Sequence, residues 1–115
     1  MMATAEECRK ALESLTGRLS GLNPQQRAAY LADRVLSCHV DDLGITFVTQ
    51  LGPDGAGPVT EVDGKDVEAQ VRFSTSSDEL LALAENPGSF ARAWLGGRIK
   101  VQASIFDLLR LRKLL

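Results

Sequence analysis

The part of the chain that most constrains its fold is the C-terminal third, Ser76–Leu115. Ser76 stands three residues before Glu79, a spacing typical of a helix N-terminus, and the leucines that follow predict a short helix that Pro87 ends. A second short helix is predicted over 90–95, where a glycine pair follows. The next residues alternate between apolar and polar, and the strand that they predict has three side chains on its buried face: Ile99, Val101 and Ala103.

The last predicted element is a helix over about 105–113 that is apolar on most of its sides. Leu108, Leu109 and Leu111 form one stripe with Ile105, whereas Phe106 lies off it. A helix that is apolar almost all round must be covered on two sides. We expect the core on one side and a ligand, a membrane or another subunit on the other, so the helix is a lid, a homodimer contact or a docking tail.

The first two thirds of the chain change from a helical to an alternating pattern. Thr4 and Glu7 form a capping box before an amphipathic helix, and Asn23 and Pro24 predict a second helix over about 25–33. Beyond residue 34, alternation predicts strands, together with a weaker strand at 59–62 and a Gly/Pro-rich loop at 52–58. The inward residues of these strands are expected to be Leu36, Cys38 and Val40, then Ile45, Phe47, Thr49 and Leu51, then Val67, Ala69, Val71 and Phe73.

The length and charge limit the possible classes of protein. The 115 residues suit one domain, 1–115, with a helical part over about 4–33 and a sheet with C-terminal helices over about 34–115. A net charge of −2 argues against a nucleic-acid partner. No apolar run approaches the roughly 20 residues of a membrane span, and the N-terminus lacks a signal-peptide pattern, so we expect a cytoplasmic protein. Cys8 and Cys38 fall in apolar positions and are expected to be core residues.

The order of these short pieces resembles one known family. The segment Arg72-Phe73-Ser74-Thr75, the helix start Asp78-Glu79-Leu80-Leu81 and the run Gly97-Arg98-Ile99-Lys100-Val101 before a leucine-rich end are similar to sterol carrier protein 2 (SCP-2-like) domains. The resemblance implies an α+β fold, with a five-stranded, mainly antiparallel sheet and helices on one face that enclose an apolar tunnel. Ala103-Ser104 and the long Gly/Pro loop depart from the family pattern.

The resemblance also implies a function, which is the non-enzymatic binding or transfer of a sterol, a fatty acid or acyl-CoA, or an isoprenoid lipid. A narrower role would be that of an accessory factor presenting quinone intermediates to biosynthetic enzymes. A lipid site needs a concave apolar lining with few polar groups. The predicted lipid-binding wall consists of Phe47, Val71, Phe73, Phe90, Trp94, Ile99, Val101, Phe106 and Leu109.

Two other interpretations of these residues stay open. The wall residues could pack against each other as an ordinary core, although small inward residues such as Ala69 and Ala103 would leave space for a ligand. Trp94 suits either a pocket rim or a core position. The basic residues near the C-terminus form either a solvated face or a weak patch for a transient membrane contact: Arg92, Arg98, Lys100, Arg110, Arg112 and Lys113.

Catalytic chemistry is sparse in the sequence. The single histidine, His39, lies opposite the inward phase of its strand, and no spacing predicts a catalytic residue, a metal site or a cofactor. A small isomerase or cyclase acting on steroid-like or polyketide-like substrates would need a carboxylate or histidine directed into the pocket. A protein-interaction module that docks through its leucine-rich end is a third class. We expect the chain not to be an enzyme.

Overall fold

The computed structural model describes residues 4–20, 25, 33–52, 55–64 and 67–114. The first helix, α1, spans Ala5–Ser20. The predicted capping box is confirmed, because the Glu7 amide donates to Thr4 Oγ1 at 3.2 Å and the Thr4 amide donates to Glu7 Oε1 at 3.1 Å. The helix predicted over 25–33 lies almost entirely outside the described residues.

A hairpin forms the centre of the sheet. Strand β1 (Arg34–Val40) pairs antiparallel with β2 (Ile45–Gly52), and Cys38 lies opposite Phe47. Gly44, in the turn between the two strands, has a φ of 65°, a left-handed conformation that glycine adopts without strain. Two short strands, β3 (Gly55–Ala56) and β4 (Thr60–Asp63), pair antiparallel with β2. The prediction of a loop over 52–58 was wrong in part, because β3 lies within it.

The other side of β1 pairs with β5 (Val71–Thr75), and this pairing is parallel. A parallel pair needs a long connection, and the intervening chain with β2–β4 provides it. Strand β6 (Lys100–Gln102) completes the sheet antiparallel to β5. The sheet order is β3-β2-β1-β5-β6, with β4 beside β2. The α+β, mainly antiparallel prediction is confirmed, with six strands in place of five. Two strands are shorter than predicted, since β5 begins at Val71, after Val67 and Ala69, and β6 omits Ile99 and Ala103.

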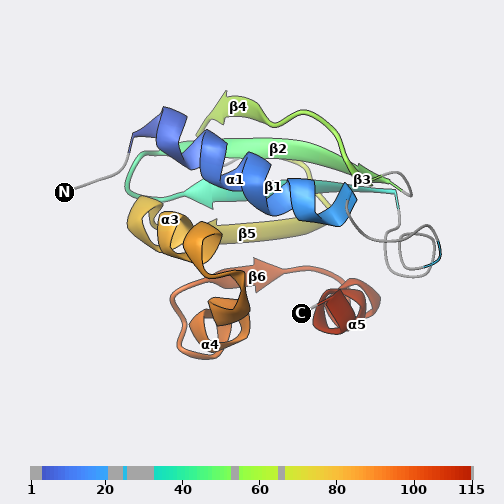
Figure 1. The fold of residues 1–115 in the computed structure, drawn as a ribbon. Coiled ribbons are helices and arrows are strands. Elements are labelled where there is room, and N and C mark those ends of the chain that lie inside the picture. Colours follow the sequence, from blue (N-terminus) through green and yellow to red (C-terminus); the bar gives the residue numbers. More distant parts are fainter. Residues whose placement is uncertain (1–3, 21–24, 26–32, 53–54, 65–66, 115) are drawn as a thin grey trace.

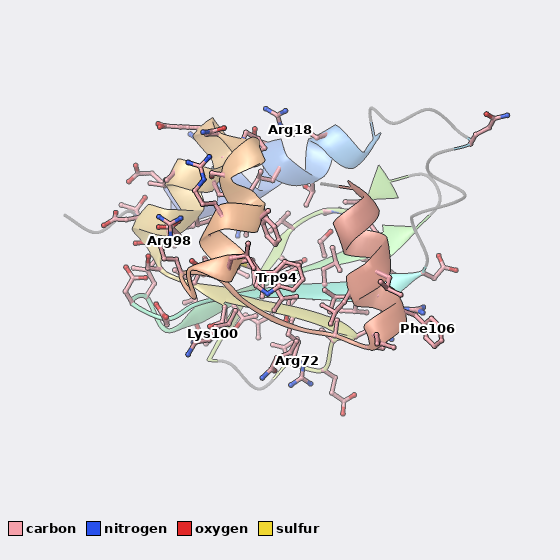
Figure 2. All side chains as sticks on the ribbon, turned by 90° about the horizontal axis from the view of Figure 1, so that it is seen from below. Arg18, Arg72, Trp94, Arg98, Lys100 and Phe106 are labelled. Atoms are coloured by element: carbon pink, nitrogen blue, oxygen red, sulfur yellow. The ribbon has the colours of Figure 1, made fainter. Side chains whose placement is uncertain are left out.

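The helices cover one face of this sheet (Figures 1 and 2). Helix α3 spans Ser77–Glu85, and its predicted cap is confirmed, because Ser76 Oγ accepts from the Glu79 amide at 3.2 Å. A turn of 3-10 helix, η1 (Pro87–Ser89), leads into α4 (Phe90–Leu95), and α5 spans Ile105–Leu114. The Ser89 hydroxyl donates to the Asn86 carbonyl at 2.7 Å and makes no cap hydrogen bond to α4, because the chain already turns in η1.

The turn between β1 and β2 fixes the start of α3. Asp42 accepts from the Ser77 amide through Oδ1 at 2.8 Å and from the Ser77 hydroxyl through Oδ2 at 2.6 Å. The Ser77 hydroxyl bond is the main reason that the pKa of Asp42 lies below its usual value. An acidic side chain at a helix N-terminus also interacts favourably with the helix dipole. This contact holds α3 over the sheet, where it covers the core.

Two apolar clusters fill the space between the helices and the sheet. The first joins α1, the central strands and α3 through buried Cys8, Ala11, Cys38, Val40, Phe47 and Leu80. The second joins α3, α4 and the residue before β6 through buried Leu83, Phe90, Ala93 and Ile99. Leu15 and Phe73 pack against both clusters. These clusters surround the cavity that forms the candidate site.

Candidate functional site

A cavity of about 300 Å³ lies between the helices and the sheet. Its floor comes from the inward phase of the central strands, because successive strand residues point to opposite faces. Leu36 of β1 illustrates this, since it lies opposite Thr49 and beside Val71, and all three line the cavity. The floor residues are Arg34, Leu36, Cys38, Phe47, Thr49, Leu51, Val71, Phe73 and Thr75.

The roof of the cavity comes from three helices. Leu12 and Leu15 of α1 occupy positions three residues apart, so that they share one helix face. Leu80 and Leu83 of α3 repeat this spacing, and Phe90 of α4 completes the apolar cover. Most of the lining is therefore hydrocarbon, as in small-molecule sites generally. The volume lies at the lower end of the roughly 300–1,000 Å³ that is usual for such sites.

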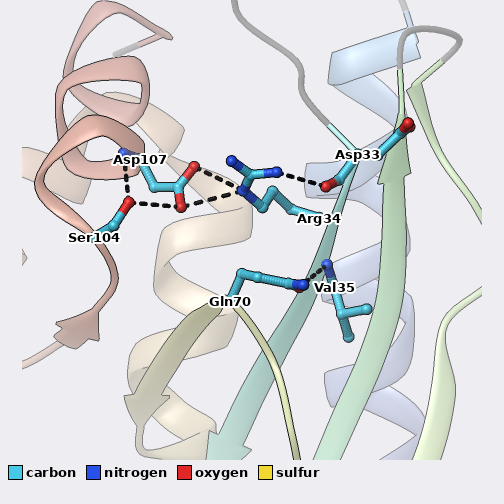
Figure 3. Close-up of polar contacts among 6 residues, drawn as sticks. All are labelled: Asp33, Arg34, Val35, Gln70, Ser104 and Asp107. Carbon is cyan, nitrogen blue, oxygen red and sulfur yellow. Dashed lines mark hydrogen bonds and ion pairs between the residues drawn. The ribbon is translucent and has the colours of Figure 1, made fainter.

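One end of the cavity is polar and contains an ion pair (Figure 3). Arg34 Nε lies 3.1 Å from Asp107 Oδ1 and 3.2 Å from Oδ2. The side chain of Asp107 is 7% exposed and that of Arg34 is 31% exposed. Asp107 Oδ2 also accepts from the Ser104 hydroxyl at 2.9 Å, and the Asp107 amide donates to Ser104 Oγ at 3.2 Å. The pair therefore joins the first turn of α5 to the start of β1.

The sequence prediction did not include Arg34 or Asp107 in the site. A signal for Asp107 was present, since Ser104 and Asp107 have the spacing of a helix cap at the start of the apolar terminal helix. Arg34 shares the alternation phase of Leu36, which places it on the inward face. The pairing of the two residues, 73 positions apart, could not be inferred from local sequence.

The nine residues of the predicted lipid-binding wall fall into three groups. Five of them line the cavity: Phe47, Val71, Phe73, Phe90 and Ile99. Trp94 and Val101 pack beside it, against the second apolar cluster. Phe106 and Leu109 lie outside the lining, with exposed fractions of 70% and 50%. A role in lipid binding stays a prediction for all nine.

Aromatic contacts connect the cavity wall to α4. The rings of Phe73 and Phe90 have centroids 6.0 Å apart at 78°, and those of Phe90 and Trp94 are 6.0 Å apart at 65°. Such edge-to-face pairs stabilise a core beyond the burial of their area. Figure 2 shows Trp94 pointing from α4 toward α5, whereas Phe106 points away from the molecule. Trp94 thus supports the wall from behind Phe90.

The ionisable groups near the cavity give it little reactivity. Cys38 lines the cavity, and burial raises the pKa of its thiol to about 12. Cys8 is also buried, and burial is the main reason that its pKa is raised. His39 lies on the outward phase of β1, where Nδ1 is 3.0 Å from Thr46 Oγ1. Since that hydroxyl donates to the Gly64 carbonyl, His39 Nδ1 is the donor to Thr46.

Within the described part of the chain, no three His, Cys, Asp or Glu side chains gather where they could hold a metal ion. Among the same residues, no helix has the length and apolar character needed to cross a membrane.

Comparison with known proteins identifies the fold. No protein-family model and no curated protein sequence matches the chain. Several solved structures do match. The sterol carrier protein domain 2 of Helicoverpa armigera has a TM-score of 0.65 and 18% identity, over 99% of this chain and 91% of that one. Palmitated SCP2L2 from Aedes aegypti has a TM-score of 0.64 and 14% identity, over 97% and 94% of the two chains.

A third match is a ubiquinone synthesis protein, UbiJ-SCP2, with a TM-score of 0.57 and 16% identity over 96% of this chain and 90% of that one. Because these structures cover almost the whole chain, the chain has the SCP-2-like fold, as the resemblance implied. The TM-scores and coverages show the shared fold, whereas identities below a fifth do not show a shared function.

Proposed function

We propose that this chain is a non-enzymatic carrier that binds one hydrophobic molecule in the cavity between the helices and the sheet. The observation that carries the proposal is the cavity itself, about 300 Å³ with a lining of aliphatic and aromatic side chains on both floor and roof. Removing apolar ligand surface from water is favourable by about 25 cal/mol per Å², before the costs of ordering.

The similar structures support the class of ligand. Two of them are named as sterol carrier proteins or their relatives, and one of these is described as palmitated. We propose a sterol, an acyl chain or an isoprenoid as the cargo of this chain. A role in presenting quinone precursors to biosynthetic enzymes is supported by the likeness to the ubiquinone synthesis protein.

The chemistry of the lining favours binding over catalysis. An isomerase or cyclase would need a carboxylate or a histidine that is able to exchange a proton with the substrate. Among the lining residues that the structure describes, Asp107 is the only carboxylate, and it is engaged with Arg34 and Ser104. His39 belongs to the outward phase of β1, and it does not contribute to the lining. We therefore assign no catalytic residue.

We further propose that α5 contacts a membrane surface when the ligand is exchanged. Three apolar side chains of its first turns are half or more exposed: Ile105, Phe106 and Leu109. Exposed apolar side chains on a helix suit insertion into the headgroup region of a lipid surface. A homodimer through α5 would cover the same side chains. The two free cysteines suit a reducing compartment such as the cytoplasm.

The proposal is tested by native mass spectrometry of protein purified from cells, followed by organic extraction of whatever remains bound. We expect one hydrophobic molecule per chain, or one-to-one uptake of a fluorescent fatty acid or sterol by the extracted protein. An empty protein that takes up neither probe would refute the carrier function.

A further inference from the structure

The ion pair between Arg34 and Asp107 borders the cavity at its polar end, where the headgroup of an amphiphilic ligand would lie. We propose that this pair makes the site selective for ligands with an uncharged hydrogen-bonding headgroup, such as an alcohol, an ester or a quinone, over ligands with a free carboxylate. This inference rests on the proposed carrier function and narrows its ligand class.

The first step of the argument is the balance of charge at this end. Three charged side chains line the cavity in the described part of the chain: Arg18, Arg34 and Asp107. Arg34 and Asp107 neutralise each other through two short contacts. Arg18 is exposed, so that water and salt screen its charge. Among the described residues, the partly buried portion of the cavity end therefore presents Arg34 and Asp107 as an ion pair and no further cation for an incoming carboxylate.

The second step is that a carboxylate cannot easily replace Asp107. The Asp107 side chain is 7% exposed, and it is held from the other side by the Ser104 hydroxyl. Displacing it from Arg34 would separate a buried carboxylate from a cation that it contacts through both oxygens, which is unfavourable. A ligand carboxylate that approached without displacing Asp107 would add a second negative charge beside the first and lose its own hydration.

A neutral headgroup avoids both costs. A guanidinium has five N–H donors, and the described hydrogen bonds of Arg34 engage Nε with Asp107 and Nη1 with the Asp33 carbonyl at 2.8 Å. A hydroxyl, ester or quinone oxygen can accept a hydrogen bond from another of these donors while the ion pair stays intact. The pair then acts as a neutral polar anchor above an apolar lining.

The experiment compares hexadecanol and palmitate, which have the same chain length and differ in headgroup charge, by competition against an uncharged fluorescent probe at neutral pH. For the wild-type protein we expect hexadecanol to bind at least about tenfold more tightly, a difference of about 1.4 kcal/mol. Asp107→Asn removes the negative charge and keeps the shape, so the affinity ratio should move toward palmitate by about tenfold or more.

Two further variants complete the charge series. Arg34→Gln removes the cation that contacts Asp107 and keeps the Asp107 carboxylate, so it should move the ratio further toward hexadecanol. The double variant, which is neutral at both positions, should return the ratio to near the wild-type value. Asp63→Asn, an identical change at an exposed position of β4, is the matched control and should leave the ratio unchanged. Circular dichroism establishes that each variant is folded. If Asp107→Asn does not fold, the affinity ratio of Arg34→Gln alone tests whether the ion pair sets the headgroup selectivity.

The outcomes separate this inference from the function on which it rests. Tighter binding of palmitate to the wild type, or a ratio that Asp107→Asn and Arg34→Gln leave unchanged, would overturn the headgroup selectivity while the carrier function stands. If neither ligand displaces the probe because nothing binds, both proposals fail.

Discussion

Filling the cavity with a side chain should abolish ligand binding at little cost in stability. Leu36 is the best position, because it lies in the middle of β1 and borders the cavity between Thr49 and Val71. In a close-packed core, an inserted group of this kind costs about 1–3 kcal/mol. Beside a cavity of about 300 Å³, the indole of a Leu36→Trp variant has room, and we expect a loss below about 1 kcal/mol.

The effect on ligand binding should be much larger. A ligand present at 100 times its Kd stabilises the folded protein by about 2.7 kcal/mol. For a domain of this size, that corresponds to a rise in Tm of about 10 °C. Wild-type protein should show this rise with hexadecanol, and Leu36→Trp should show almost none because the indole occupies the space of the ligand.

Urea unfolding at 25 °C measures the change in the free energy of unfolding. Thermal unfolding followed by circular dichroism, with and without hexadecanol, measures the ligand-dependent rise in Tm. Val35→Trp is the matched control, because Val35 neighbours Leu36 on β1 but has the opposite strand phase and does not line the cavity. It should retain the ligand-dependent rise in Tm. A Leu36→Trp variant that keeps the full rise would refute the assigned site, and one that loses 1–3 kcal/mol while the wild type shows no rise would indicate a filled core.

Three further predictions concern stability, reactivity and the terminal helix. Asp42→Ala should lower the free energy of unfolding by about 1–2 kcal/mol at neutral pH, because it leaves the buried Ser77 hydroxyl without its acceptor. The pKa of Asp42 is lowered in the folded state, so its contribution to the free energy of unfolding is present above the unfolded-state pKa of about 3.9 and is lost as pH falls through the lower folded pKa. Urea titrations at neutral pH and near pH 3 should therefore show a smaller stability difference between wild type and Asp42→Ala in acid. Burial raises the pKa of Cys8 and Cys38, so a thiol reagent should label the native protein at least about 100-fold more slowly than the urea-unfolded chain, and equal rates would contradict the buried placement. Phe106→Ser should leave the free energy of unfolding within about 0.5 kcal/mol and hexadecanol affinity unchanged, while it weakens sedimentation with anionic vesicles; a loss of cavity affinity instead would place Phe106 in the ligand site.

Much of the fold could be predicted because its signals are local. The capping pairs Thr4–Glu7 and Ser76–Glu79 each lie within one helical turn, and both form the predicted hydrogen bonds. Alternation in β1 and β2 also placed the floor of the cavity correctly, since strand phase depends on immediate neighbours. Five of the nine predicted wall residues line the cavity. Strand phase accounts for Phe47, Val71 and Phe73, whereas Phe90 comes from α4 and Ile99 precedes β6.

The remaining features depend on how distant segments meet. The parallel pairing of β1 with β5 follows from the path of the intervening chain, which no local pattern encodes. Helix α5 is apolar on most sides, so its sequence does not tell which side faces the core, and Phe106 and Leu109 are exposed in the structure. The ion pair of Arg34 and Asp107 fixes that orientation from 73 positions away.

The most direct test of the carrier function is to locate a bound ligand by intermolecular nuclear Overhauser effects. In a one-to-one complex with hexadecanol, protons of the alkyl chain should show contacts to the methyl groups of Leu36, Val71 and Leu83, which surround the cavity from both floor and roof. Contacts confined to Ile105, Phe106 and Leu109 on the outer side of α5, or no saturable contact at all, would contradict the account.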